Sequence, residues 1–170
     1  QAPRPMLDGT GQQTFDSTEQ AASALFAAVK DKNRAALQLI FGPKSDSVLY
    51  SGDPVEDDSG LNAFRNLYQE RHQFENTSPT AATLLVGRDE SPFPIPLVES
   101  GKRWRFDTQA GAEEIINRRI GDNELNAISL CEDYVQAQQD YYSADWDRNG
   151  VAEYAKLFFS TVGKKDGLFW

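Results

Sequence analysis

The chain has 170 residues, of which 39 % are hydrophobic and 11 % aromatic, enough apolar material for one folded domain or for a domain with a helical appendage. Its 26 acidic and 17 basic residues leave a net charge of −9, which argues against nucleic acid as a partner because such a surface repels phosphate backbones. A single cysteine excludes an internal disulfide, and no apolar run reaches the roughly 18 residues that a membrane span needs.

The first half of the chain predicts a flexible lead-in followed by three helices. Residues 1–13 are rich in Pro, Gly and Gln, which favours a flexible N-terminus. The stretch "FDSTEQAASALFAAVKDKN" predicts an amphipathic helix capped by Asp16, with Glu19 completing a capping box. Next, "NRAALQLIFGP" predicts a short helix between Asn33 and Gly42, "SVLYSGDP" a strand or turn, and "GLNAFRNLYQERHQF" a third helix with His72 near its end.

The middle of the chain changes to a strand pattern. "AATLLVG" predicts a buried strand, and "PFPIPLVESGKRWRFDT" predicts a hairpin near 94–107 that turns at Glu99–Lys102. The prolines place the arm "SPFPIP" either at a sheet edge or in a pre-extended segment that docks on a partner, which makes Phe93 and Ile95 candidate interaction residues.

From residue 110 the pattern is helical again. "AGAEEIINRRI" predicts a helix that ends near Gly121, and Asp122 then caps a long helix with a buried stripe of Leu125, Ile128, Cys131 and Val135. "VAEYAKLFFS" predicts a last helix. The tail ends in Leu168, Phe169 and Trp170, which we expect to dock on a partner chain because an apolar terminus in water is unfavourable. The order of elements predicts an α+β fold, with an α+β unit at 14–109 and a helical C-terminal segment at 110–170 packed on it; one compact domain is the alternative.

One stretch near the end resembles the first half of a calcium-binding loop. Oxygen ligands at alternate positions followed by a glycine are typical of such loops, and "DWDRNGVAE" has this spacing in Asp145, Asp147, Asn149, Val151 and Glu153. The twelfth position is Lys156 where a bidentate Glu is expected, and Asp and Asn-Gly also form caps and turns without metal. Calcium is therefore the one cofactor that the sequence suggests, and no other is expected.

Four segments resemble a known bacterial family: "QQTFDSTEQAASALFAAV", "SGDPVEDD", "PFPIPLVESGKRWRFDTQAGAEEIINRRIGDNEL" and "DYVQAQQDYYSADWDRNGVAEYAKLFFSTVGKKDGLFW". The chain is similar over nearly its whole length to the domain of unknown function 2950 family. The resemblance implies exported, signal-bearing proteins of Gram-negative bacteria without an assigned activity, and it transfers no catalytic residue. Family members continue past "GKKDGLFW" into a Gly- and Tyr-rich region. The chain begins with "QAPRP" and not with Met, which reads like a mature N-terminus after signal-peptide removal or like a chain trimmed for expression.

Two hypotheses about function follow. The first is an exported, non-enzymatic accessory protein of the periplasm, or a secreted one, that works in a larger assembly with other protein chains, in an envelope complex or as a homo-oligomer. The lone His72 and Cys131 do not suffice for a zinc site, and no nucleophile motif accompanies His72. The second is a small-ligand-binding or weakly catalytic α+β domain with a pocket like that of nuclear-transport-factor folds, lined by Tyr68, Phe93, Trp104 and Phe106.

Overall fold

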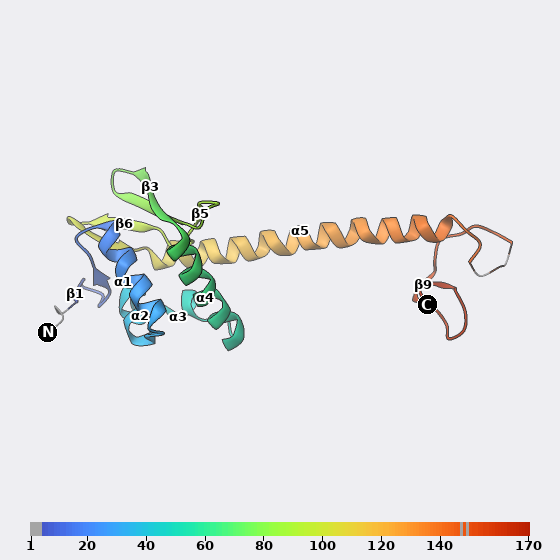
Figure 1. The fold of residues 1–170 in the computed structure, drawn as a ribbon, viewed down its shortest axis with the longest axis horizontal. Helices are drawn as coiled ribbons and strands as arrows, with labels where there is room; N and C mark the ends of the chain where they lie inside the picture. The colour runs from blue at the N-terminus through green and yellow to red at the C-terminus, as the bar shows by residue number, and fades with distance from the viewer. Residues whose placement is uncertain (1–4, 147, 149) are drawn as a thin grey trace. The chain divides into compact units, whose positions relative to one another are not determined.

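The computed structural model describes residues 5–146, 148 and 150–170, and the chain divides into two compact units, Gln1–Asn117 and Arg118–Trp170 (Figure 1). Helices and antiparallel strands occur together, so the predicted α+β class is confirmed. The two units are described separately below.

The first unit contains most of the regular structure. Its strands are β1 (Met6–Leu7), β2 (Gln13–Thr14), β3 (His72–Ser78), β4 (Ala81–Val86), β5 (Ser91–Pro92), β6 (Leu97–Ser100) and β7 (Arg103–Phe106). Its helices are α1 (Thr18–Lys30), α2 (Arg34–Phe41), α3 (Asp46–Leu49), α4 (Pro54–Glu70) and the start of α5 (Thr108–Tyr142). The second unit contains the rest of α5 and two short strands, β8 (Leu157–Phe159) and β9 (Gly167–Phe169).

The helix starts follow local capping rules, with one correction. Helix α1 begins one residue later than predicted, because Ser17 rather than Asp16 caps it: the Ser17 hydroxyl accepts a hydrogen bond from the Gln20 backbone N–H. The Gln20 side chain in turn accepts one from the Asp16 N–H, so Gln20 takes the role that was assigned to Glu19. Helix α2 is capped by Asn33, as predicted.

Two further boundaries differ from the prediction. The segment expected to be a strand or turn contains the short helix α3, and α4 begins at Pro54 because Asp53 caps it. Proline is favoured at the first position of a helix, where its missing N–H has no partner to lose. Helix α4 ends at Glu70, so His72 opens strand β3 instead of closing a helix. Strand β3 escaped prediction because it is largely polar and exposed, with a single apolar residue, Phe74.

The main sheet is antiparallel, in the order β3-β4-β6-β7, with β5 paired to β4. The predicted hairpin is confirmed: β6 and β7 pair so that Leu97 lies opposite Phe106. Strand β4 alternates half-buried and buried residues, with Ala82, Leu84 and Val86 buried. In Figure 1 the helices α1, α2 and α4 gather on one side of this sheet, and their apolar faces complete a core with the buried strand residues.

The N-terminal segment, expected to be flexible over 1–13, is joined to this core at Gln12. The Gln12 side chain is buried and donates hydrogen bonds to the carbonyl oxygens of Ile40 at 2.9 Å and Phe106 at 2.8 Å. Its own carbonyl oxygen accepts one from Arg105 at 3.3 Å. Gly42, at φ 77°, leaves room for this side chain, because a Cβ there would lie 2.9 Å from Gln12 Cβ.

Helix α5 is one continuous helix where the sequence predicted two. It passes through Gly121 and Asp122, and Gly121 does not take the left-handed conformation with which glycine ends many helices. An interior glycine costs a helix only about 1 kcal/mol relative to alanine, which the surrounding good helix formers can offset. Gly111, near the start of the same helix, lies against Ile95 so closely that a Cβ would come within 2.6 Å of the Ile95 Cγ1 atom.

The predicted last helix is wrong. Residues 151–156 are irregular, and Leu157–Phe159 form β8, which pairs in parallel with β9. Consecutive leucine and phenylalanine side chains suit an extended strand as well as a helix, and the pairing with Gly167–Phe169 decides between them. Within the described residues, no helix has both the length and the apolar character needed to cross a membrane.

Candidate interaction surface

The second unit exposes the apolar residues that would ordinarily form a core. Among its described residues, Tyr141 is the one hydrophobic side chain that is buried. The stripe predicted to be buried is exposed: Leu125 is 66 % exposed, Ile128 56 % and Val135 54 %. Cys131 is also exposed, so the prediction of a buried thiol is wrong. The helical period was read correctly, but it does not say whether another element covers the face.

A second set of residues on α5 has a stricter spacing. They recur at alternating intervals of three and four residues, and we call them the α5 stripe: Ile120, Asn123, Ala127, Leu130, Tyr134 and Ala137. This is the spacing of a coiled-coil seam, in which the side chains stay on one side of the helix. Of the large members, Ile120 and Tyr134 are each 48 % exposed and Leu130 is 68 % exposed. Sequence reasoning missed the α5 stripe because the false break at Gly121 separated its beginning from the remainder.

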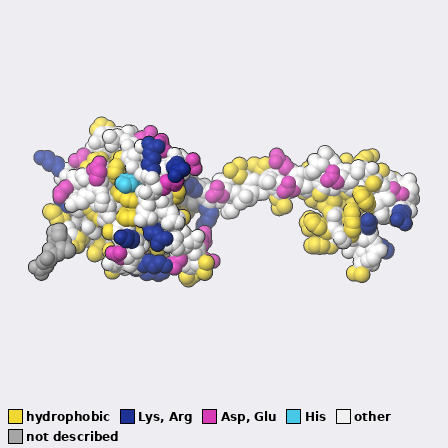
Figure 2. All heavy atoms as spheres, viewed as in Figure 1, with side chains coloured by type: hydrophobic (Ala, Val, Ile, Leu, Met, Phe, Trp, Pro, Cys, Tyr) yellow, Lys and Arg dark blue, Asp and Glu magenta, His cyan; other side chains and the backbone are white. Residues whose placement is uncertain are grey.

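Three phenylalanines of the tail form a second exposed apolar group, the tail cluster: Phe158, Phe159 and Phe169. Their ring centroids lie 5.1 to 6.1 Å apart, so the rings pack on one another while all three side chains stay more than half exposed. Figure 2 shows apolar side chains at the surface along the helix and on the tail. Phe169, predicted as an interaction residue, belongs to this cluster.

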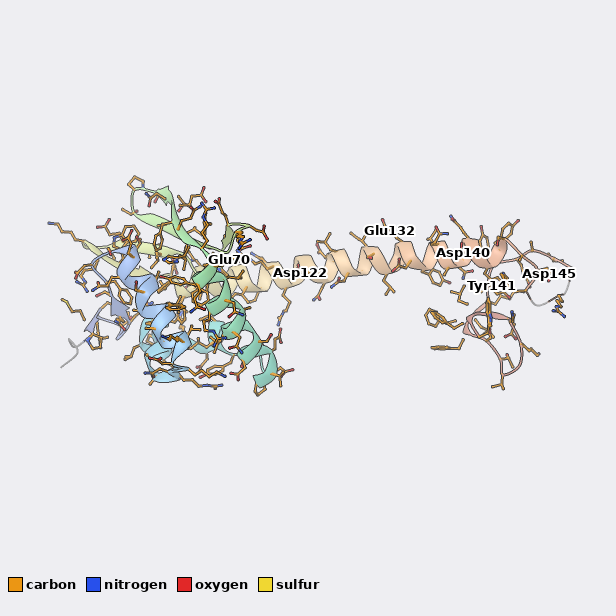
Figure 3. The ribbon with its side chains drawn as sticks, viewed as in Figure 1. Glu70, Asp122, Glu132, Asp140, Tyr141 and Asp145 are labelled. Atoms are coloured by element: carbon orange, nitrogen blue, oxygen red, sulfur yellow. The ribbon has the colours of Figure 1, made fainter. Side chains whose placement is uncertain are left out.

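The tail is held against the end of α5 by hydrogen bonds within the unit. The Gln138 side chain donates to the Ala155 carbonyl oxygen at 3.0 Å and accepts from the Ala155 N–H at 2.8 Å. The Tyr141 hydroxyl donates to the Lys165 carbonyl oxygen at 2.8 Å. Figure 3 shows Tyr141 pointing from the helix toward the tail, with Glu132 on the opposite side of the helix. The tail therefore covers the side of α5 that carries Tyr141, near the end of the α5 stripe.

A carboxylate closes the turn between the two tail strands. Asp166 accepts hydrogen bonds from the Thr161 backbone N–H at 2.7 Å and from the Thr161 hydroxyl at 2.9 Å. The bond from the Thr161 N–H holds the pKa of the Asp166 carboxyl below its ordinary value of 3.8. Asp166 also lines, with Tyr141 and Tyr154, an open hollow of about 320 Å³.

Trp170 ends the described chain beside another tryptophan. The ring centroids of Trp146 and Trp170 are 5.2 Å apart, and the Lys165 ammonium nitrogen lies 5.2 Å and 4.9 Å from them, respectively. A cation near two aromatic faces is attracted by both. Trp170 is nevertheless 59 % exposed and Leu168 is half-buried, so these two predicted interaction residues do present surface.

The calcium-loop residues are only partly described. Asp147 and Asn149 lie outside the described residues. Asp145 accepts a hydrogen bond from the Gly150 N–H at 2.9 Å, and Glu153 forms an ion pair with Lys156 at 2.9 Å. Val151 is exposed. Over the described parts of the chain, no group of three or more His, Cys, Asp or Glu side chains is placed to hold a metal ion, and calcium binding stays a prediction.

The proline arm contributes to the core of the first unit. Ile95 is buried against Gly111, and Phe93 is half-buried, with its ring centroid 5.1 Å from that of Phe64 and 6.2 Å from that of Phe106. Phe106 is fully buried. The aromatic side chains expected to line a ligand pocket therefore pack on one another or on the core cluster.

His72 also has a packing role. Its ring stacks on Tyr68 with the centroids 3.9 Å apart, and its Nδ1 lies 3.0 Å from the Tyr68 carbonyl oxygen. The other face of Tyr68 stacks on Phe26 at 4.7 Å. Burial raises the pKa of the Tyr68 hydroxyl. This stack fixes the start of β3 against α4.

These features define a class of protein: an α+β unit followed by a helical and aromatic unit that leaves most of its large apolar side chains uncovered. The chain belongs to the family described as "Protein of unknown function (DUF2950)", which it matches over residues 12–170. No curated protein and no solved structure matches it.

Proposed function

We propose that the protein is a non-enzymatic interaction protein, exported to the periplasm or secreted, which works in an assembly through its second unit. The observation that supports this is the uncovered apolar surface of that unit, the α5 stripe together with the tail cluster. Soluble proteins rarely leave large contiguous apolar patches in water, and such patches are typical of protein interfaces. The aromatic residues of this surface are of the type enriched in interface cores.

The charges of the first unit support a different role for it. Its ion pairs, such as Lys32 with Asp58 at 2.9 Å and Arg71 with Glu90 at 3.0 Å, lie at the surface with both side chains largely exposed. Pairs of this kind contribute little to stability and keep a surface soluble. We infer that the first unit is a folded, solvated support and that the second unit makes the contacts.

The experiment is site-specific photo-cross-linking in the cells that make the protein. A photoreactive phenylalanine analogue replaces Tyr134 in the α5 stripe or Phe159 in the tail cluster, and Gln136, on another side of α5, serves as the control. We expect discrete adducts with protein from the first two positions and none from Gln136. Equal labelling at all three positions, or no adduct at any, would refute the proposal; cell fractionation tests the proposed location.

A further inference from the structure

The α5 stripe has a composition that fits a second copy of the same helix. Its residues alternate in size along the seam: the large side chains Ile120, Leu130 and Tyr134 are interspersed with the smaller Asn123, Ala127 and Ala137. A coiled-coil seam packs well when each large side chain meets a small one in the facing helix, because two small ones leave a cavity and two large ones clash.

Only one orientation meets this requirement. In an antiparallel pair, the register that places Ile120 opposite the second copy's Ala137 also places Asn123 opposite Tyr134 and Ala127 opposite Leu130. Every layer then combines a larger with a smaller side chain, and the Tyr134 hydroxyl lies opposite a side chain that can hydrogen-bond to it. A parallel pair in register would instead set Tyr134 against Tyr134 and Ala127 against Ala127.

The charges beside the seam agree with the same register. It brings Arg119 of one copy next to Asp140 of the other, twice by symmetry, which is a favourable pair at the rim. It also places Asp133 opposite Asn126. The remaining flanking acid, Glu124, faces Cys131, so no two acids oppose each other despite the overall charge of −9.

We infer that the protein forms an antiparallel homodimer through the α5 stripe, over residues 120–137. The inference rests on the proposed function, because it names the partner of the surface on which that proposal depends. The interface is isologous, as in most symmetric dimers, since each copy contributes the same helix face. Residue 141 is not part of the seam, because Tyr141 is already buried under the tail.

The first test is the mass in solution of the whole chain and of two matched variants. Leu130 and Leu125 are nearly equally exposed, at 68 % and 66 %, but only Leu130 belongs to the α5 stripe. Sedimentation equilibrium should give twice the 19.0 kDa chain mass for the native protein and for Leu125→Glu. It should give the single chain mass for Leu130→Glu, with circular dichroism confirming that the helix is intact.

The second test fixes the orientation. In a Cys131→Ser background, Ile120→Cys and Ala137→Cys proteins are oxidised separately and then mixed. An antiparallel pair predicts a disulfide-linked dimer in the mixture alone, because the two copies of position 120 would lie roughly 25 Å apart along the helices. A parallel pair would link Ile120→Cys to itself.

Three outcomes overturn the inference: a monomer at all soluble concentrations, a dimer that tolerates Leu130→Glu but not Leu125→Glu, or self-linking of Ile120→Cys. A monomer whose Tyr134 position still cross-links to another protein in cells would overturn the dimer while leaving the proposed function intact. A dimer without any cellular adduct to a further protein means that the second copy alone covers the surface.

Discussion

Replacing either of two glycines of α5 by alanine should have opposite effects on stability. In an ordinary helix interior, Gly→Ala stabilises by about 1 kcal/mol, since alanine has less backbone freedom to lose and is the better helix former. Gly121 has no atom within 4 Å of the position that a Cβ would take, so Gly121→Ala should stabilise α5 by about that amount.

Gly111 lies in a different environment. A Cβ there would lie 2.6 Å from Ile95 Cγ1 and 2.9 Å from both Ile95 Cβ and Cγ2, and Ile95 is buried, with little room to shift. Overpacking of a core costs about 1–3 kcal/mol. This outweighs the helix term, so Gly111→Ala should lower the free energy of unfolding of the first unit by about 1–2 kcal/mol, the difference of the two effects.

Urea unfolding followed by tryptophan fluorescence measures the effect. Trp104 is the one tryptophan of the first unit, so a Trp146→Phe, Trp170→Phe background reports on that unit alone. The clash predicts non-additivity: in an Ile95→Ala background, which removes both Cγ atoms, Gly111→Ala should cost clearly less. If Gly111→Ala stabilises the first unit, or if its cost is the same with and without Ile95, the close approach of α5 to the proline arm is wrong.

Two further predictions concern hydrogen bonds. Gln12→Ala should lower the free energy of unfolding of the first unit by about 1–3 kcal/mol, because it leaves the buried carbonyl oxygens of Ile40 and Phe106 without their donor; the same urea assay checks this, with exposed Gln69→Ala as a control expected to have little effect. Asp166→Ala should loosen the tail turn at neutral pH, as seen in the fluorescence of Trp146 and Trp170 in a Trp104→Phe background. Because the folded pKa of Asp166 is lowered, its contribution is fully present above the ordinary value of 3.8 and is lost as the pH falls through the folded pKa. The difference between wild type and variant should therefore vanish in acid, and a difference that is unchanged there would contradict the assignment.

Much of the first unit could be predicted because its local signals agree with its packing. Asn33 caps α2, and the alternation around Trp104 and Phe106 marks a strand of the hairpin. The misses occurred where a local signal was weak or ambiguous. Strand β3 is polar because one side of it faces solvent, and its pairing with β4 makes it a strand. Gln12 gave no signal at all, since its three partners lie 28 to 94 residues away in the chain.

The candidate surface could be predicted only in part. Phe169 and Trp170 were identified because apolar residues at the end of a polar segment stand out, whereas Phe158 and Phe159 were assigned to a helix that does not form. Leu125, Ile128 and Val135 were expected to be buried because an apolar stripe usually is. The same period is produced by a face that packs within the chain and by one that packs on a partner.

The amino-acid sequence by itself determined the class of fold, the helical and strand periods and the family, since these depend on residue types at fixed spacings. Only the tertiary structure decided which of the apolar faces are covered, where α5 continues and which strands pair, because each depends on contacts between residues distant in the chain. The free energy of an interior glycine is small beside that of packing, so the helix runs through Gly121 while Gly111 marks a close contact.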